Sequence, residues 1–361
     1  MTPLWRTRRM KHHILFARQA NLERTWPFVA HRLETRLTAL GDLTVINVDV
    51  DTPLSEVVDL TNVVAIAYFG GRLTESCIAR SLNLRLVGAV LDGTGLTHVP
   101  VDCMLERDIA LIDATCAWSS SVAECTLALA INALRRIPQW HRAMAEGKPL
   151  WEFEYAQFCD PPNFVNGTLG TKTVGVIGLG QIGGRVAAWC NMLGARVMGY
   201  DPFVSRSRLE ELGTEPVEID QLVDTAEIIF VAVPPTPSAR HLLSRERIDR
   251  LGRGALVVIT TRAHAVDMDA LRRRIMAGEL AGAFDVYDVE PLPVDDPLRG
   301  RDNVVHVPHI AGRTKNANLS VADTLADDFA RVLRGEQPRH RLSRVQIAVR
   351  SERADLPPMA G

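Results

Sequence analysis

The chain has 361 residues, more than a single hydrophobic core usually serves, so two domains are expected. Its composition is that of an ordinary globular protein, with 47% apolar and 23% charged residues. The 41 basic and 43 acidic side chains leave a formal charge of −2, and this balance argues against nucleic acid or an anionic membrane as a partner.

Six cysteines occur, with no CxxC pair and no metal-ligand spacing to histidine, so neither a metal site nor a disulfide framework is expected. Their pattern favours free thiols in a reducing compartment, and we expect a cytoplasmic protein. No uninterrupted run of about 18 apolar residues predicts a membrane span. Residues 5–13 are basic and precede the first acid, Glu23. A short solvated arm is favoured there, with a transit peptide as the alternative.

Short apolar runs alternate with amphipathic stretches along the chain, which indicates βαβ units and a parallel sheet. The first series of expected strands is Ile14 to Phe16, Leu43 to Val48, Val63 to Tyr68, Arg85 to Val90 and Ile109 to Asp113. The second series is Val174 to Ile177, Arg196 to Tyr200, Ile228 to Val233, Ala255 to Thr260, Ala281 to Phe284 and Val304 to Val307. The sequence therefore predicts an α/β protein with two doubly wound parallel-sheet domains, Rossmann-like or flavodoxin-like.

A long helical connector is expected over residues 121–146, with Ser121 and Glu124 spaced as a capping box. Residues 147–170 are rich in Pro, Asn and Gly with aromatic residues at alternate positions, which is typical of an arm on a partner subunit or of a surface loop. The last clear helix, Ala317 to Leu333, is expected to return to the first domain. The domains then comprise residues 1–120 with 314–361, and 121–313. The charged tail from Pro338 is expected to be partly disordered.

A dinucleotide-binding fingerprint follows the first strand of the second series. Gly178 permits the tight turn, Gly180 lets the backbone approach a pyrophosphate, and Gly183 lets the helix pack closely on the strand. Asp201 falls 18 residues after Gly183, where a carboxylate binds the adenosine ribose and repels a 2′-phosphate. NAD is therefore favoured over NADP. A purely structural strand-to-helix turn is the alternative.

Charged residues follow three later strands of the second series. Arg262 follows one strand, Asp285 and Glu290 follow the next, and His309 follows the last. Ligands of open α/β sheets bind at the carboxyl ends of the strands, so these side chains are candidates for a cation, a proton donor and a group that tunes the donor. Singly, each has an ordinary structural explanation: a surface arginine, a turn, or a core histidine.

Together these motifs resemble the D-isomer-specific 2-hydroxyacid dehydrogenases, a family that includes phosphoglycerate dehydrogenases and glyoxylate/hydroxypyruvate reductases. The resemblance rests on residues 178–183, Thr261-Arg262 with Val266-Asp267, residues 284–291 and Pro308-His309-Ile310-Ala311-Gly312. It implies an active site in the cleft between two domains. It also implies that Arg262 holds the substrate carboxylate, that His309 exchanges the proton, and that Glu290 hydrogen-bonds His309.

The resemblance further implies which residues contact the ligands. Asp285 would face the nicotinamide, and the loop Phe69-Gly70-Gly71 would offer backbone N–H groups to the substrate. The loop Asp92 to Gly95 would be a second glycine turn near the cleft, or else an ordinary turn. The implied cofactor-binding set is Gly178, Gly180, Gln181, Ile182, Gly183, Asp201, Pro234, Thr260, Asp285, His309 and Gly312.

These roles agree with side-chain chemistry. A neighbouring carboxylate stabilises imidazolium and so raises the affinity of His309 for its proton. The planar fork of Arg262 matches a planar carboxylate, which a lysine does not. The other histidines, such as His12, His13 and His340, lack such context and are expected to be solvated.

Several positions depart from the family pattern. Ile259 replaces the usual Asn, and Ala263 and His264 follow the arginine where glycine is usual at the first position. These changes predict a narrowed or re-aimed substrate site. Ala232 stands where a histidine is common, which predicts weaker cofactor binding.

The leading hypothesis is an NAD-dependent oxidoreductase that interconverts a small 2-oxo acid and its D-2-hydroxy acid. One alternative is an NAD(H)-sensing binding protein similar to the C-terminal-binding corepressors. Another is a phosphite dehydrogenase-like enzyme; formate enzymes resembling the family carry glutamine in place of Glu290, which counts against a formate dehydrogenase. The resemblance also implies a homodimer.

Overall fold

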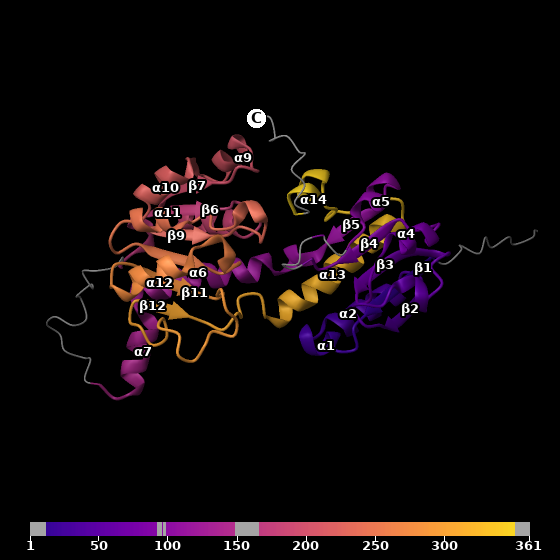
Figure 1. Ribbon diagram of the computed structural model, residues 1–361, viewed down its shortest axis with the longest axis horizontal. Coiled ribbons are helices and arrows are strands. Elements are labelled where there is room, and N and C mark those ends of the chain that lie inside the picture. Colours follow the sequence, from indigo (N-terminus) through magenta and orange to yellow (C-terminus); the bar gives the residue numbers. More distant parts are fainter. Residues whose placement is uncertain (1–11, 92–95, 97–98, 149–165, 351–361) are drawn as a thin grey trace, which may run out of the picture. The chain divides into compact units, whose positions relative to one another are not determined.

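The computed structural model describes residues 12–91, 96, 99–148 and 166–350. These residues form two compact units, residues 12–118 with 315–350 and residues 119–314 (Figure 1). Most of the expected arm over residues 147–170, the turn at 92–95 and most of the basic N-terminus lie outside the described residues.

The first unit contains a five-stranded parallel sheet with the order β2-β1-β3-β4-β5. This is the flavodoxin-like order of doubly wound folds. Its strands are β1 (His13–Arg18), β2 (Asp42–Asn47), β3 (Val63–Phe69), β4 (Leu86–Ala89) and β5 (Ala110–Asp113). Its helices are α1 (Leu22–Thr25), α2 (Val29–Thr38), α3 (Leu54–Val57), α4 (Glu75–Arg80), α5 (Val101–Glu106), α13 (Lys315–Leu333) and α14 (Arg344–Arg350).

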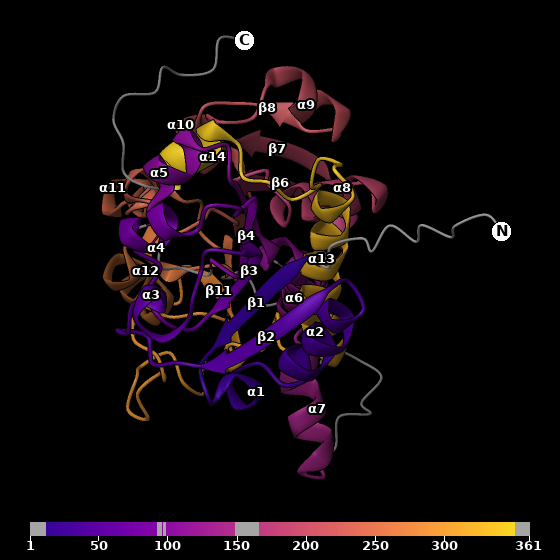
Figure 2. The ribbon, with the colours of Figure 1, turned by 90° about the vertical axis from the view of Figure 1, so that its right-hand side faces the viewer.

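Helix α13 returns to this unit, as predicted. It lies beside α2, as Figure 2 shows, and it also contacts β4. Arg36 of α2 pairs with Asp323 and Asp327 of α13. Phe329 of α13 is fully buried among the apolar side chains on this face of the sheet.

The tail, which was expected to be partly disordered from Pro338 on, has a defined structure in its described part, residues 338–350. Leu342 donates its backbone N–H to Leu111 O, and α14 follows. Arg350 pairs with the buried carboxylate of Asp113 at 2.5 Å. His340 is not simply solvated, because its Nδ1 lies 3.0 Å from the buried carboxylate of Asp328. These contacts hold the tail on the end of β5.

The second unit contains a seven-stranded parallel sheet with the order β12-β11-β10-β9-β6-β7-β8. The six strands from β8 to β11 have the dinucleotide-binding order, and β12 adds a seventh strand beside β11. The strands are β6 (Thr173–Ile177), β7 (Arg196–Tyr200), β8 (Glu215–Pro216), β9 (Ile228–Val231), β10 (Leu256–Ile259), β11 (Ala281–Phe284) and β12 (Val304–His306). The helices are α6 (Ser119–Arg135), α7 (Ile137–Ala145), α8 (Gly183–Met192), α9 (Arg206–Glu211), α10 (Ile219–Thr225), α11 (Arg245–Arg250) and α12 (Met268–Met276).

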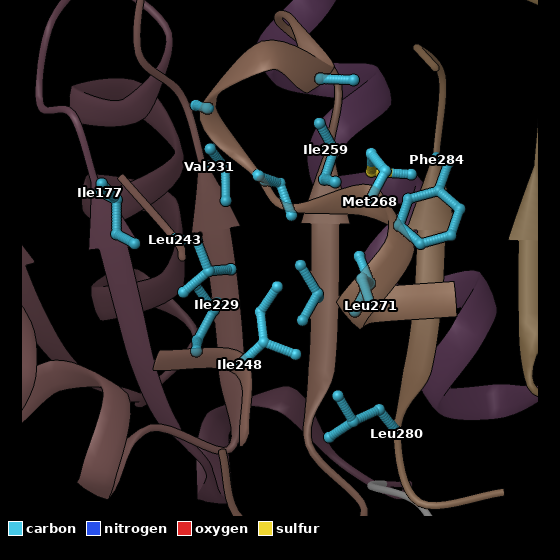
Figure 3. Close-up of a cluster of buried hydrophobic side chains, with 14 of the residues drawn as sticks. Ile177, Ile229, Val231, Leu243, Ile248, Ile259, Met268, Leu271, Leu280 and Phe284 are labelled. Atoms are coloured by element: carbon cyan, nitrogen blue, oxygen red, sulfur yellow. The ribbon is translucent and has the colours of Figure 1, made fainter. Parts of the chain in front are cut away.

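Apolar residues on both faces of this sheet are buried, as expected for a parallel sheet covered by helices. On one face, Ile229 and Ile259 pack with Leu243, Ile248 and Leu271 from the connecting segments (Figure 3). The sheet therefore gives a rigid frame to the residues that follow its strands.

The connector differs from the prediction in two ways. The helix begins at Ser119, so Ser121 lies inside α6 and is not its cap; its hydroxyl donates to Ala311 O at 2.7 Å. The expected single helix over 121–146 is broken at Arg136, which has a left-handed φ of 51°, two residues before Pro138. A proline restricts the residue before it and lacks a donor for the helix, so α7 starts anew.

Residues Ala114–Arg135 form one helical stretch that is long and apolar enough, by length and composition, to cross a membrane. Packing explains this apolar character, because α6 contacts β10, β11 and β12, and Ala123, Leu129 and Ala130 are buried. The core helix of a domain has the same composition.

Candidate active site

Three candidate residues lie at one edge of the second sheet. The register pairs Ile259 with Phe284, and Phe284 with His306, across β10, β11 and β12. Arg262, Asp285 and His309 follow these strands by one to three residues. Because the carboxyl ends of parallel strands meet at one edge, the sheet brings these three residues to the same side.

His309 and Glu290 form a hydrogen-bonded pair. The Nδ1 atom of His309 lies 2.6 Å from Oε2 of Glu290. A carboxylate oxygen only accepts, so Nδ1 carries the hydrogen and Nε2 is the ring atom left to exchange a proton with a ligand. The side chains are 33% and 35% exposed, so solvent and ligand can reach the pair.

The second oxygen of Glu290 is also engaged. Its Oε1 accepts the backbone N–H of Tyr287 at 2.9 Å. The hydroxyl of Tyr287 is directed at Val307 O, 3.2 Å away, and burial raises the pKa of this phenol. Tyr287 thus connects the Glu290 loop to the segment that leads into His309, and no motif or spacing in the sequence predicts this role.

Asp285 holds the backbone of the histidine loop. His309 has a left-handed φ of 53°, and its N–H donates to Asp285 O at 2.9 Å. The carboxylate of Asp285 accepts the N–H groups of Ile310 at 2.6 Å and Ala311 at 3.1 Å. Burial raises the pKa of Asp285, and these two amides oppose that effect. The family resemblance implies that this carboxylate faces the nicotinamide. In the structure it is hydrogen-bonded to the loop that carries His309.

Arg262 is half-buried and donates from Nη1 to the carbonyl of Thr261 at 2.8 Å. Beside it, Ala263 is buried and His264 is partly buried in a short 3-10 turn. Both ring nitrogens of His264 are buried and make no hydrogen bond of ordinary geometry within the described residues. Burial lowers the pKa of His264, and the charge of Arg262 adds to this; the backbone of Thr236 opposes it. A neutral imidazole therefore stands next to the candidate carboxylate-binding cation.

The glycine turn has the geometry that a dinucleotide needs. Gly178 has a φ of 88°, and a Cβ on Gly183 would lie 1.9 Å from Gly178 O, so neither position accepts a side chain. A Cβ on Gly180 would meet nothing within 4 Å, so a ligand can approach the backbone there. Within the described residues, the N–H groups of Gly180, Gln181 and Ile182 have no protein partner. These donors precede α8 and fit a pyrophosphate.

Asp201 lies at the end of β7, where the fingerprint predicts the ribose carboxylate. Its Oδ2 accepts the N–H of Leu179 at 2.8 Å, and its Oδ1 accepts that of Phe203 at 2.9 Å. The carboxylate therefore ties the glycine turn to β7. Each oxygen keeps a lone pair for a ribose hydroxyl.

The remaining predicted cofactor residues differ in exposure. Pro234 and Gln181 are exposed, and Gly312 is half-buried. Thr260 is buried, with its hydroxyl 2.5 Å from that of Thr126. Since Thr126 donates to Val122 O, Thr260 donates to Thr126 and can offer a cofactor only an acceptor.

The predicted substrate loop belongs to the first unit. Phe69 is buried and packs against Phe16 and Trp26, so its side chain is part of the core. A Cβ on Gly70 would lie 2.4 Å from the Arg18 backbone, and Gly71 has a φ of 76°. The N–H groups of Gly70 and Gly71 find no partner among the described residues, which leaves the donor role open to them.

Comparison with known proteins identifies the family of this chain. Residues 127–311 match the NAD binding domain of D-isomer specific 2-hydroxyacid dehydrogenases. A D-3-phosphoglycerate dehydrogenase of Archaeoglobus fulgidus is 37% identical over 259 residues, which are 72% of this chain and 47% of that protein. A glyoxylate reductase of Korarchaeum cryptofilum is 30% identical over 269 residues, which are 74% of this chain and 79% of that protein.

A solved phosphoglycerate oxidoreductase from Rhizobium etli has the same fold. It superimposes with a TM-score of 0.78 at 25% identity, covering 92% of this chain and 99% of that one. The chain spans about half the length of the curated phosphoglycerate dehydrogenases that it matches. On the family match, the identities and the strand-end site, the chain belongs to the D-isomer specific 2-hydroxyacid dehydrogenase family and contains its NAD-binding domain.

Proposed function

We propose that the protein is an NAD-dependent oxidoreductase that interconverts a small 2-oxo acid and its D-2-hydroxy acid. The observation that carries this proposal is the His309–Glu290 pair at 2.6 Å, in the domain that has the bare glycine turn. The relatives named D-3-phosphoglycerate dehydrogenase and glyoxylate reductase support the same substrate class.

The chain's own residues supply binding and proton transfer. Arg262 would hold the substrate carboxylate through its planar fork. His309 would give its Nε2 proton to the substrate oxygen during reduction and take it back during oxidation, while Glu290 stabilises the imidazolium. A bound nicotinamide supplies the hydride that adds to the substrate's C2 carbon.

The cofactor preference is part of the proposal. Asp201 directly follows β7, and its carboxylate accepts the N–H groups of Leu179 and Phe203. A 2′-phosphate beside this carboxylate would bring like charges together, whereas ribose hydroxyls would donate to it. We therefore propose NAD as the physiological cofactor.

The test is NADH oxidation against glyoxylate, hydroxypyruvate, pyruvate, phenylpyruvate and branched 2-oxo acids. His309→Ala should nearly abolish turnover and leave NADH binding intact, because the imidazole acts on the substrate. His31→Ala removes an exposed histidine and is the matched control. NADH binding without turnover of any acid by the wild type would instead favour a sensor or an enzyme of another substrate class, and oxidation of phosphite would identify the latter.

We also propose a cytoplasmic homodimer. Helix α7 buries none of its side chains in the described chain, and Ile137 and Met144 on it are 46% and 50% exposed. Cys77, Cys103, Cys125 and Cys190 are free thiols, as a reducing compartment allows. Light scattering of the protein, with Ile137→Glu and Met144→Glu beside the wild type, tests the dimer: a dimeric mass is expected, and the charged variants should lower it.

A further inference from the structure

Glu290 lies in a long loop, residues 285–303, between β11 and β12. A carboxylate that must stay 2.6 Å from His309 needs such a loop to be held in one conformation. The loop has little regular structure of its own, so its position depends on contacts with neighbouring elements.

Arg272 of α12 makes two of these contacts. Its Nη1 and Nη2 donate to Oδ2 and Oδ1 of Asp288 at 2.8 and 2.6 Å, and Nη2 also donates to Oδ2 of Asp296 at 3.0 Å. The guanidinium thus binds Asp288 bidentately and also hydrogen-bonds Asp296. Asp288 and Asp296 stand on either side of Glu290 in the sequence.

Arg272 and Asp296 are largely removed from water, and Asp288 is partly exposed. The side chains of Arg272, Asp296 and Asp288 are 15%, 6% and 35% exposed. The hydrogen bonds that Arg272 donates to Asp288 lower the pKa of Asp288, and the same bonds raise the pKa of Arg272. Buried ion pairs of this kind often stabilise a fold no better than apolar residues, so their specific geometry is the more informative property.

The geometry connects the cluster to the proton-exchanging pair. Asp288 lies within the turn in which Tyr287 donates its N–H to Glu290. A fixed position of Asp288 therefore restrains both the Tyr287 N–H and the Glu290 carboxylate, the donor and the acceptor of that hydrogen bond. The hydroxyl of Tyr287, directed at Val307 O, carries the restraint to the segment before His309.

We propose that Arg272 is a positioning residue for the Glu290–His309 pair. Through Asp288 and Asp296 it fixes the loop that presents the Glu290 carboxylate to Nδ1 of His309. This role rests on the proposed function for its effect on turnover, but its effect on the hydrogen bond does not depend on the substrate.

The experiment compares Arg272→Met, Arg272→Lys and Asp288→Asn with Arg273→Met. Arg273 is the next residue of α12 and forms an exposed ion pair with Asp249, so its variant is the matched control. The readouts are kcat, KM, the Kd of NADH, the pH–rate profile of 2-oxo acid reduction, the melting temperature, and the downfield proton resonance of the Nδ1–H group in the full-length protein.

In Arg272→Met we expect kcat to fall about tenfold, with KM and the Kd of NADH nearly unchanged. The alkaline limb of the pH–rate profile should move to lower pH, because a displaced Glu290 stabilises the His309 imidazolium less. The nearby Asp285 carboxylate keeps its own effect on the imidazolium in this variant. The downfield resonance should weaken or shift upfield. Arg272→Lys should recover part of these losses, and Arg273→Met should resemble the wild type.

A folded Arg272→Met protein with an unchanged pH profile and an unchanged resonance would overturn the proposal, even if its melting temperature falls. If Arg272→Met does not fold, Asp288→Asn decides, since Arg272 keeps Asp296 as a partner there. Should the wild type reduce no 2-oxo acid, the proposed function fails, whereas the resonance still shows whether Arg272 holds the pair.

Discussion

Replacing Glu290 by glutamine tests the reasoning about the site most directly. Both carboxylate oxygens have donors, His309 Nδ1 at 2.6 Å and the Tyr287 N–H at 2.9 Å. A glutamine of the same shape has one acceptor oxygen, so its NH2 group must face one of these two donors. If it faces His309, the ring must accept at Nδ1 and carry its proton on Nε2 as a neutral imidazole.

The magnitude follows from these two contacts. A hydrogen bond to a charged group contributes about 1.5–3 kcal/mol. At 1.36 kcal/mol per factor of ten, its loss alone slows proton transfer about 10- to 150-fold. A neutral imidazole is also a much weaker acid than imidazolium, so kcat for 2-oxo acid reduction should fall about 100-fold or more, within the range of general acid catalysis.

The assay is steady-state NADH oxidation, with NADH binding measured by fluorescence. Asp295→Asn removes an exposed carboxylate from the same loop and should leave kcat close to that of the wild type. The Kd of NADH should be unchanged in both variants. A folded Glu290→Gln protein with the kcat and pH profile of the wild type would refute the assignment of Glu290 as the partner that stabilises the acid.

Two further predictions concern the cofactor and the histidine beside Arg262. Asp201→Ala should raise the ratio of kcat/KM for NADPH over NADH about tenfold, since a like-charge contact is removed; an unchanged ratio would contradict the ribose assignment, and Asp201→Asn controls for the acceptor lost to Leu179 and Phe203. Burial lowers the pKa of His264, so the unfolded chain binds more protons and stability falls as the pH drops below about 6.5. The melting temperature of His264→Ala should therefore decline less than that of the wild type between pH 7.5 and 5.5, about a unit either side of that value, and an equal decline would show that His264 is not responsible.

The two sheets were predictable because apolar runs mark the strands, and their alternation with amphipathic stretches indicates parallel βαβ units. Each predicted run overlaps one observed strand, and the ends differ by at most two residues. The two-residue strand β8, Glu215–Pro216, was missed because so short a segment has no period. The break at Arg136 had a signal in Pro138, but the amphipathic pattern continues across it and favoured one helix.

The site was predictable only as far as strand ends determine it. The order of strands brings Arg262, Asp285 and His309 to one edge, and this follows from the fold. The partners of each side chain do not follow, because they depend on loop conformation. No periodicity or spacing in the sequence predicts the hydrogen bonds of the Asp285 carboxylate to Ile310 and Ala311. The same is true of the ion pair between Arg272 and Asp288.

Charge balance at this edge of the sheet leads to a last expectation. Glu290 and Asp285 contribute two negative charges, and Arg262 with a protonated His309 contributes two positive ones, so the formal sum of these four groups is zero. An anionic 2-oxo acid then meets no net repulsion. With a neutral side chain in place of His309 the sum becomes −1, and the substrate carboxylate is bound less well.

The KM of a 2-oxo acid should therefore rise in His309→Asn, together with the fall in kcat. The affinity for NADH, which depends on the glycine turn and Asp201, should be the same in this variant as in the wild type. Measuring kcat and KM for both proteins separates the two effects. A KM that stays constant while kcat falls would mean that the charge of His309 acts on proton transfer alone and that Arg262 by itself accounts for binding of the carboxylate.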